Sequence, residues 1–227
     1  MPPPTHFLCI PLVGAELVRN LASFKHEATS QWGFRVPPAA VRPPGTMHLT
    51  LGVMTLQEDG VQKATDLLQS LSLKDILAQT SNNAVESTLS ISLKGLSAMQ
   101  DAGSTSVLYA PPVDADGRLM RFCQAIKTSF TDAGLMAVEN RPLLLHATVV
   151  NTVYVPQTRK RGRPREKIKL DARDMVEQYA DFVWMEDMPV EKVTLCKMGA
   201  RKIEGSDGDE AYEVVAEVRV GTETTGA

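Results

Sequence analysis

The chain has 227 residues, of which 43% are hydrophobic and 22% are charged, and its formal net charge is −3. A chain of this size buries on the order of 70% of its unfolded surface, and its composition excludes a disordered tail protein, a collagen, a coiled coil and a disulfide-knotted toxin. Cys9, Cys123 and Cys196 are odd in number and lack a CxxC spacing, which argues against a disulfide framework and a zinc ribbon.

The amino-terminal residues do not resemble a targeting signal. Residues 1–5 are rich in proline and lack a basic region, and the apolar stretch 7–13 is too short for a signal sequence or a membrane span. We therefore expect an intracellular protein of the nucleus, the cytoplasm or both, with no membrane contact. We also expect a monomer that needs no cofactor.

The first half of the chain predicts two strands, each followed by a helix. Hydrophobic residues partly alternate in the strands and recur at helical spacing in the helices. A segment with four prolines separates the two units and is a loop by composition. The predicted ranges are 6–13 and 47–56 for the strands, 15–27 and 58–71 for the helices, and 36–46 for the loop.

The second half predicts further strands and two more helices. The strands are expected at 85–93, 105–110, 143–155, 192–198 and 212–220, and the helices at 118–134 and 171–179. The order of elements is that of an α+β protein rather than a strict βαβ alternation, and the two halves look alike. We expect a single domain over residues 5–220 and a disordered tail at 221–227.

Two of the four histidines lie in the same local sequence. His48–Leu51 reads His-Leu-Thr-Leu and His146–Val149 reads His-Ala-Thr-Val, each inside a predicted strand. Since side chains alternate between the two faces of a strand, His and Thr share one face and the apolar residues the other. A core face would leave these polar groups unpaired, so we expect both motifs to line one shared site.

This pairing suits acid–base chemistry on a phosphate. Two imidazoles with ordinary pKa values near 6.5 can serve at neutral pH as one base and one acid. His48 and His146 are therefore the candidate catalytic pair, and the hydroxyls of Thr50 and Thr148 can donate to phosphate oxygens as charge builds there. Ordinary strand residues and a metal site are the competing interpretations. No nearby Asp, Glu or Cys pattern supplies further ligands, so we expect no metal.

The twin motifs resemble those of the 2H phosphoesterase superfamily, two-histidine enzymes with a duplicated fold. Leu108–Ala110, Ala133–Leu135 and Leu145–Thr152 are similar to the phosphoesterase domain of activating signal cointegrator complex subunit 1. Leu195–Met198 is similar to the A-kinase anchoring protein nuclear-localisation-signal domain. The resemblance covers residues 5–220. The cointegrator subunit carries an RNA-binding KH module before this domain, for which we expect no counterpart in this chain.

The resemblance implies a bilobal fold with two pseudo-symmetric antiparallel sheets, outer helices and a central cleft that holds both motifs. It implies catalysis by His48 and His146, phosphate binding by Thr50 and Thr148, and substrates that are RNA ends or nucleotides with 2′,3′-cyclic or related phosphoesters. The A-kinase anchoring relatives resemble nucleotide binders more than efficient enzymes. A nucleotide- or RNA-binding module without turnover is therefore the alternative to a metal-independent phosphodiesterase.

Two aromatic residues are candidates to stack on a nucleobase. They are Phe7 and Tyr154, and such stacking stabilises by about 1–3 kcal/mol per base. A place in the core is the simpler expectation for Phe7. The remaining histidines, His6 and His26, are expected to be structural or solvated.

The charge is distributed unevenly along the chain. Residues 159–169 hold seven basic residues and one acidic residue, so the rest of the chain has 17 basic and 26 acidic residues and a net charge of −9. An acidic body with one basic segment predicts contact with a polyanion at a single place. The expected contact residues are Arg159, Lys160, Arg161, Arg163 and Arg165.

The basic segment contains Arg-Gly-Arg-Pro, the core of an AT-hook-like motif. Because it follows the second histidine motif closely, we expect a flexible loop over residues 157–169 that contacts RNA phosphates. A solvated basic loop, minor-groove DNA binding by a chromatin protein and a nuclear-import signal are the alternatives.

Overall fold

The computed structural model describes residues 2–80, 88–156, 168–206 and 208–220. The predicted tail at 221–227 and most of the predicted loop at 157–169 lie outside these residues. Within them, no helix is long and apolar enough to cross a membrane.

Seven antiparallel strands form the main sheet, in the order β12-β9-β1-β2-β7-β5-β4. A three-stranded sheet has the order β6-β3-β8, and β10 pairs with β11. The strands of the main sheet are β1 (His6–Pro11), β2 (His48–Met54), β4 (Ser97–Ala98), β5 (Val107–Ala110), β7 (Ala147–Asn151), β9 (Lys192–Lys197) and β12 (Val214–Arg219). The others are β3 (Ser90–Lys94), β6 (Pro112–Val113), β8 (Val183–Pro189), β10 (Arg201–Lys202) and β11 (Glu210–Ala211).

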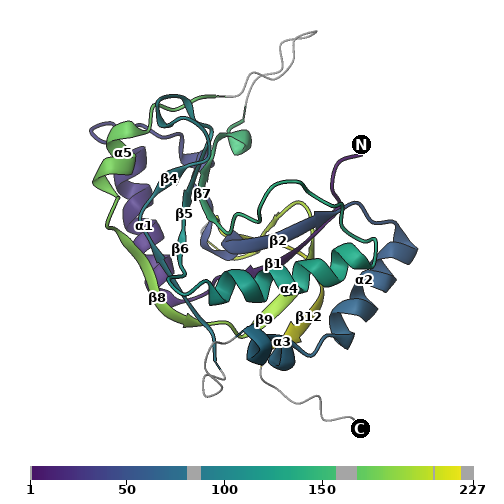
Figure 1. Ribbon diagram of the computed structural model, residues 1–227. Helices are drawn as coiled ribbons and strands as arrows, with labels where there is room; N and C mark the ends of the chain where they lie inside the picture. Colours follow the sequence, from purple (N-terminus) through teal and green to yellow (C-terminus); the bar gives the residue numbers. More distant parts are fainter. Residues whose placement is uncertain (1, 81–87, 157–167, 207, 221–227) are drawn as a thin grey trace.

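The helices flank these sheets on the outside (Figure 1). The helices are α1 (Ala15–Thr29), α2 (Glu58–Ser70), α3 (Leu73–Thr80), α4 (Arg118–Asp132) and α5 (Arg173–Gln178). The 3₁₀ turns are η1 (Pro38–Ala40), η2 (Pro44–Thr46), η3 (Ala102–Ser104) and η4 (Thr152–Tyr154).

The molecule has two lobes that exchange helices (Figure 1). One lobe contains β1, β2, β9 and β12 with α2, α3 and α4, and the other contains β3 to β8 with α1 and α5. Helix α1 follows β1 directly but packs on β8, whereas α4 follows β6 but packs on β2 and α3. Each half of the chain therefore supplies a helix to the opposite lobe.

The amphipathic pattern of α1 explains why it can cover the other lobe. Leu17, Leu21, Phe24 and Ala28 recur at helical spacing and are buried, and each large side chain contributes about 1.5–3 kcal/mol by leaving water. Phe24 packs edge-to-face on Trp184 of β8. The indole N–H of Trp184 donates to the Gly95 carbonyl (2.7 Å), so this large buried side chain leaves no polar atom unpaired.

The structure confirms the α+β class and corrects several element boundaries. The two longest elements that were not predicted are α3 and β8. In α3, Leu73 and Leu77 form only one turn of apolar spacing, and the alternation in β8 is interrupted at Asp187, whose φ of 46° lies in the left-handed region. Strand β5 ends at Ala110 as expected, and Pro112 begins the short strand β6 at the edge of the three-stranded sheet. An edge strand tolerates proline because one side of it needs no N–H donor.

The strand expected at 143–155 is much shorter in the structure. It begins at Ala147 and ends at Asn151, so His146 lies just before β7. The neighbouring strand β5 ends at Ala110, which pairs with Ala147, and the next residue is Pro111. Because proline has no backbone N–H, the ladder cannot continue past this pair.

Candidate active site

The two histidine motifs meet where the lobes join. Strands β2 and β7 are antiparallel neighbours in the main sheet, and Leu49 pairs with Ala147. One step to either side of this pair, the antiparallel register sets His48 opposite Thr148 and Thr50 opposite His146. Each histidine therefore faces the threonine of the other motif, which the sequence could not show.

Alternation along both strands aims the polar residues at one face. Leu49, Leu51, Ala147 and Val149 are fully buried. His48, Thr50, His146 and Thr148 are all partly exposed. The expected division of faces is confirmed by this burial pattern.

Two pockets flank the Leu49–Ala147 pair, and each contains one histidine and one threonine. The smaller, of about 160 Å³, contains His48 and Thr148, and the larger, of about 340 Å³, contains Thr50 and His146. The smaller pocket is lined by Arg42, Thr46, His48, Thr148, Asn151, Tyr154 and Tyr212. The larger is lined by Thr50, Leu51, Gly52, Val53, Met99, Lys127, Glu139, Arg141, Pro142, Leu143, Leu144 and His146. The four predicted motif residues thus line two pockets, one on either side of the Leu49–Ala147 pair.

Both imidazoles are held by the same local hydrogen bond. Nδ1 of His48 lies 2.7 Å from the Thr46 carbonyl oxygen, and Nδ1 of His146 lies 2.9 Å from the Leu144 carbonyl oxygen. A carbonyl only accepts, so Nδ1–H must donate in both cases. In the neutral ring the lone pair is then on Nε2, on the side away from the supporting loop.

The surroundings of His48 keep it neutral. Its pKa is lowered from 6.5 to about 4, mainly by burial; the charges of His146 and Arg42 also lower it, and the hydrogen bond to the Thr46 carbonyl opposes these effects. A neutral imidazole with a free Nε2 lone pair is a proton acceptor at pH 7. His48 therefore has the protonation state and tautomer of a general base.

Phe7 is buried, as the simpler expectation had it, and is therefore not available as a candidate for base stacking. Its side chain is only 2% exposed. Its ring packs on the His48 imidazole (4.9 Å between centroids) and on the Tyr212 ring (4.8 Å). The apolar β1 strand carries Phe7 into the layer beneath the pocket, where it supports His48.

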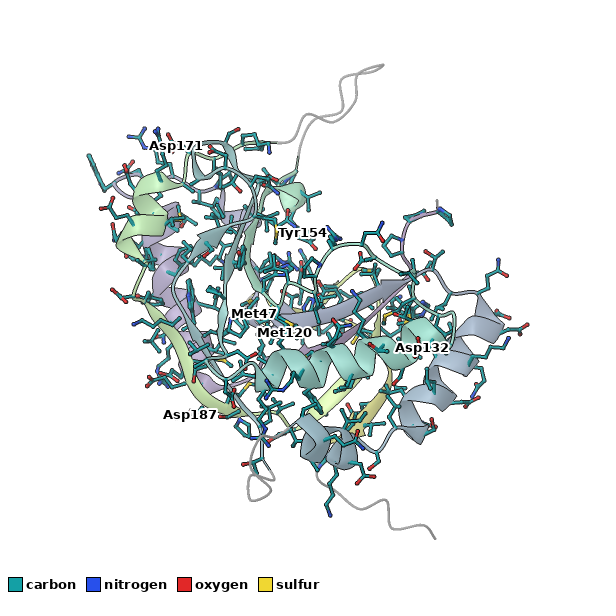
Figure 2. All side chains as sticks on the ribbon, viewed as in Figure 1. Met47, Met120, Asp132, Tyr154, Asp171 and Asp187 are labelled. Carbon is teal, nitrogen blue, oxygen red and sulfur yellow. The ribbon has the colours of Figure 1, made fainter. Side chains whose placement is uncertain are left out.

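Tyr154 is available for stacking and lies between the two lobes (Figure 2). Its side chain is 43% exposed, and the guanidinium carbon of Arg42 lies 3.6 Å from its ring centroid. The other two histidines lie outside both pockets. His26 is exposed on α1, and His6 is buried with Nδ1 2.9 Å from the Thr5 hydroxyl.

Several pocket residues were missed from the sequence. Arg42, Asn151 and Tyr212 line the smaller pocket, and Lys127 lines the larger. Lys127 is mostly buried and forms an ion pair with Glu139 (2.8 Å). The missed residues come from separate segments with no shared motif. The one available signal was an arginine directly before two prolines in a loop adjoining the first motif.

The predicted nucleic-acid contacts Arg159, Lys160, Arg161, Arg163 and Arg165 lie outside the described residues. The residues that flank this segment are described. The Thr152 hydroxyl donates to the Ile168 carbonyl (2.7 Å), next to Tyr154 of the smaller pocket. The described parts of the chain contain no group of three or more His, Cys, Asp and Glu side chains placed to hold a metal ion.

Comparison with known sequences gives a family match over almost the whole chain. The model of the AKAP7 2′5′ RNA ligase-like domain matches residues 4–220. An uncharacterized protein of Schizosaccharomyces pombe is 28% identical over 217 residues, which cover 93% of this chain and 94% of that protein. Activating signal cointegrator 1 complex subunit 1 of Mus musculus is 25% identical over 197 residues, covering 79% of this chain and 54% of that protein. The matched region thus spans about half the length of the mouse relative.

Comparison with solved structures identifies the fold. Escherichia coli LigT complexed with 3′-AMP superposes with a TM-score of 0.55 at 15% identity, over 97% of this chain and all of that chain (100%). A structure described as a phosphoesterase has a TM-score of 0.55 at 18% identity, over 96% of this chain and 99% of that one. The protein TT0787 of Thermus thermophilus has a TM-score of 0.53 at 16% identity, over 95% and 97%. The expected bilobal α+β fold is confirmed.

Proposed function

Since the chain belongs to the AKAP7 2′5′ RNA ligase-like domain family of 2H phosphoesterases, we propose that it is a phosphodiesterase that acts through His48 and His146. The substrate class is an RNA end or nucleotide that carries a 2′,3′-cyclic phosphate or a related phosphoester. No metal ion takes part in the proposed reaction.

The register of β2 against β7 is the observation that carries this proposal. It sets each histidine opposite the threonine of the other motif, and the two pockets have the same pairing. A phosphate bound over the Leu49–Ala147 pair would have one imidazole on either side, and a threonine hydroxyl beside each imidazole. This is the arrangement that in-line displacement at phosphorus requires of an acid–base pair.

In the proposed step, one histidine removes a proton from the nucleophile and the other supplies a proton to the leaving group. Nε2 of His48 accepts a proton from the attacking water as its oxygen bonds to phosphorus. His146 enters the step as the imidazolium, with Nδ1–H donating to the Leu144 carbonyl; its Nε2–H gives a proton to the ribose oxygen as the bond from that oxygen to phosphorus breaks, and proton exchange with solvent returns both histidines to their starting states. The hydroxyls of Thr50 and Thr148 donate to non-bridging oxygens, whose charge increases in the transition state.

The pockets offer space for the parts of a nucleotide on both sides of the phosphate. The walls of the larger one include the apolar side chains of Leu143 and Leu144 beside the charged Lys127. Nucleotide binding is a property of E. coli LigT, which has been solved with 3′-AMP and with ATP. These complexes support the same ligand class for this chain.

Turnover of a 2′,3′-cyclic mononucleotide in the presence of a metal chelator tests the proposal. Replacing His48 or His146 by alanine should each lower kcat by about 10²–10⁴-fold, the usual contribution of an acid–base group. His26→Ala, on the exposed surface of α1, is the matched control and should keep wild-type activity.

Full activity in either catalytic variant would refute the assignment of the histidines. Loss of wild-type turnover on adding the chelator would refute metal independence. If the wild-type protein binds the nucleotide but forms no product, the alternative of a non-catalytic nucleotide-binding module holds instead.

A further inference from the structure

Arg42 is a buried cation fixed beside the first histidine motif. Its backbone N–H donates to the Val149 carbonyl (2.8 Å), and Val41 forms a bridge with Val150, so the loop is attached to β7. Pro43 and Pro44 follow directly and restrict the backbone. The side chain is thereby held in the pocket that contains His48 and Thr148.

The protein surroundings leave the Arg42 guanidinium incompletely paired. The residue is 6% exposed. Its Nη2 lies 3.6 Å from Oε2 of Glu210, and among the described residues Nη2 has no hydrogen-bond partner. Tyr154 covers one face of the guanidinium, and Arg42 also forms a side-chain hydrogen bond with the Tyr212 hydroxyl, which leaves Nη2 as its unused donor. A buried cation with an unused donor is unfavourable unless a further anion is present.

We propose that Arg42 is a further binding residue of this site and donates to a non-bridging oxygen of the substrate phosphate. The proposal rests on the proposed function, because it places the phosphate between the two motifs. The planar guanidinium matches two phosphate oxygens better than an ammonium does. Arg42 also places a positive charge at this site in a chain whose net charge is negative.

A purely structural role for Arg42 explains less of the geometry. In that case Arg42 would hold the β10–β11 hairpin on the site through Glu210. The hairpin has a stronger attachment of its own, because the Asp209 carboxylate accepts from the backbone N–H of Gly45 at 2.9 Å, and β11 contacts η2. The 3.6 Å separation from Glu210 is too long for a hydrogen bond.

Binding of inorganic phosphate to the intact protein tests the proposal without requiring turnover. At constant ionic strength, Arg42→Gln should weaken phosphate binding by about 10- to 100-fold, which corresponds to loss of a hydrogen bond to a charged group. Arg42→Lys should weaken phosphate binding less than Arg42→Gln, because lysine keeps the positive charge although it lacks the planar pair of donors of a guanidinium. Glu210→Gln is the matched control. It removes the carboxylate partner, keeps Arg42, and should bind phosphate at least as tightly as the wild type.

The outcomes separate the two roles of Arg42. Wild-type phosphate affinity in Arg42→Gln would overturn the proposal, and so would equal losses in Arg42→Gln and Glu210→Gln, which would show that Arg42 acts through the ion pair. The thermal transition of Arg42→Gln shows whether this variant folds. If it does not fold, Arg42→Lys is tested in its place, and an unchanged phosphate affinity of Arg42→Lys overturns the proposal.

The phosphate assay also separates this proposal from the proposed function. A wild-type protein that binds phosphate through Arg42 but turns over no cyclic nucleotide leaves the Arg42 proposal standing and removes the enzymatic one. A wild-type protein that turns over the nucleotide, with kcat/KM unchanged by Arg42→Gln, removes only the Arg42 proposal.

Discussion

The two histidines form the same local hydrogen bond but have different surroundings. Each imidazole donates from Nδ1 to the carbonyl two residues earlier in the chain, so each presents Nε2 to the pocket. His48 lies against the rings of Phe7 and Tyr212, whereas His146 has one aromatic neighbour, Tyr109, among the described residues. The pseudo-symmetric motifs are therefore chemically unequal, and the inequality favours His48 as the base of the proposed reaction.

The low pKa of His48 makes the stability of the protein depend on pH. In the unfolded chain this histidine takes up a proton near pH 6.5, but in the folded protein it does so only near pH 4. Because the folded pKa is depressed, the stabilising preference for the neutral form is fully present above pH 6.5 and is lost as the pH falls towards 4. Burial is the main cause of the lowered pKa, the charges of His146 and Arg42 add to it, and the Thr46 carbonyl opposes it.

His48→Gln should remove this pH dependence. Between pH 7 and pH 4.5, the free energy of unfolding of the wild-type protein should fall by on the order of 2 kcal/mol more than that of His48→Gln. Urea denaturation of both proteins at the two pH values measures the difference. Parallel curves for the two proteins would contradict the shifted pKa.

At the level of elements, the site depends on a single pairing between two strands. Leu49 and Ala147 are the register pair that joins β2 to β7, and both are fully buried beneath the pocket. Each strand is held on its other side by a longer ladder, β1 for β2 and β5 for β7. The positions of the catalytic candidates therefore follow from how the two lobes are fixed to each other.

The exchanged helices provide that attachment. Asn20 of α1 donates from Nδ2 to the carbonyls of Val183 and Trp184 at 3.0 and 3.1 Å. These carbonyls belong to β8, an edge strand of the three-stranded sheet. One side chain thus links a helix that follows β1 to the sheet of the opposite lobe.

Replacing Asn20 should lower the stability of the protein without affecting ligand binding. Asn20→Ala should reduce the free energy of unfolding by about 1–3 kcal/mol, because two strand carbonyls lose their donor. Ser23→Ala, at an exposed position of the same helix, should change it by less than about 0.5 kcal/mol. Chemical denaturation measures both, and an equal effect of the two substitutions would rule out the proposed link.

At the level of the whole molecule, the distribution of charge matters more than its sum. The net charge is −3, but without residues 159–169 the chain carries −9. An acidic surface repels a polyanion unless basic groups compensate locally. We propose that the basic segment supplies this compensation near the site, since its flanking residues Thr152 and Ile168 are hydrogen-bonded beside the smaller pocket.

Deleting residues 159–165 should weaken binding of single-stranded RNA and reduce its dependence on salt. Each lost phosphate contact changes the slope of log K against log salt by about 0.7 for a single strand. Titrations at several salt concentrations measure the slope, with phosphate binding as the control for an intact site. An unchanged slope would mean that the segment is merely solvated, and a preference for A·T-rich duplex would favour DNA binding.

The sequence by itself determined the residue types at the site and the class of fold. In an extended segment a period of two places His48 with Thr50 and His146 with Thr148 on one face, since alternation is a property of the single strand. The amphipathic helices α1, α2 and α4 were also predictable, because each buries its own apolar stripe.

Only the tertiary structure decided which groups meet. The opposition of His48 to Thr148, the burial that depresses the pKa of His48, the loss of Phe7 to the core and the approach of Arg42 all depend on contacts between segments far apart in the chain. Such contacts have no local pattern. Their energies depend on distance and on exclusion of water, and both are set only when the two lobes pack together.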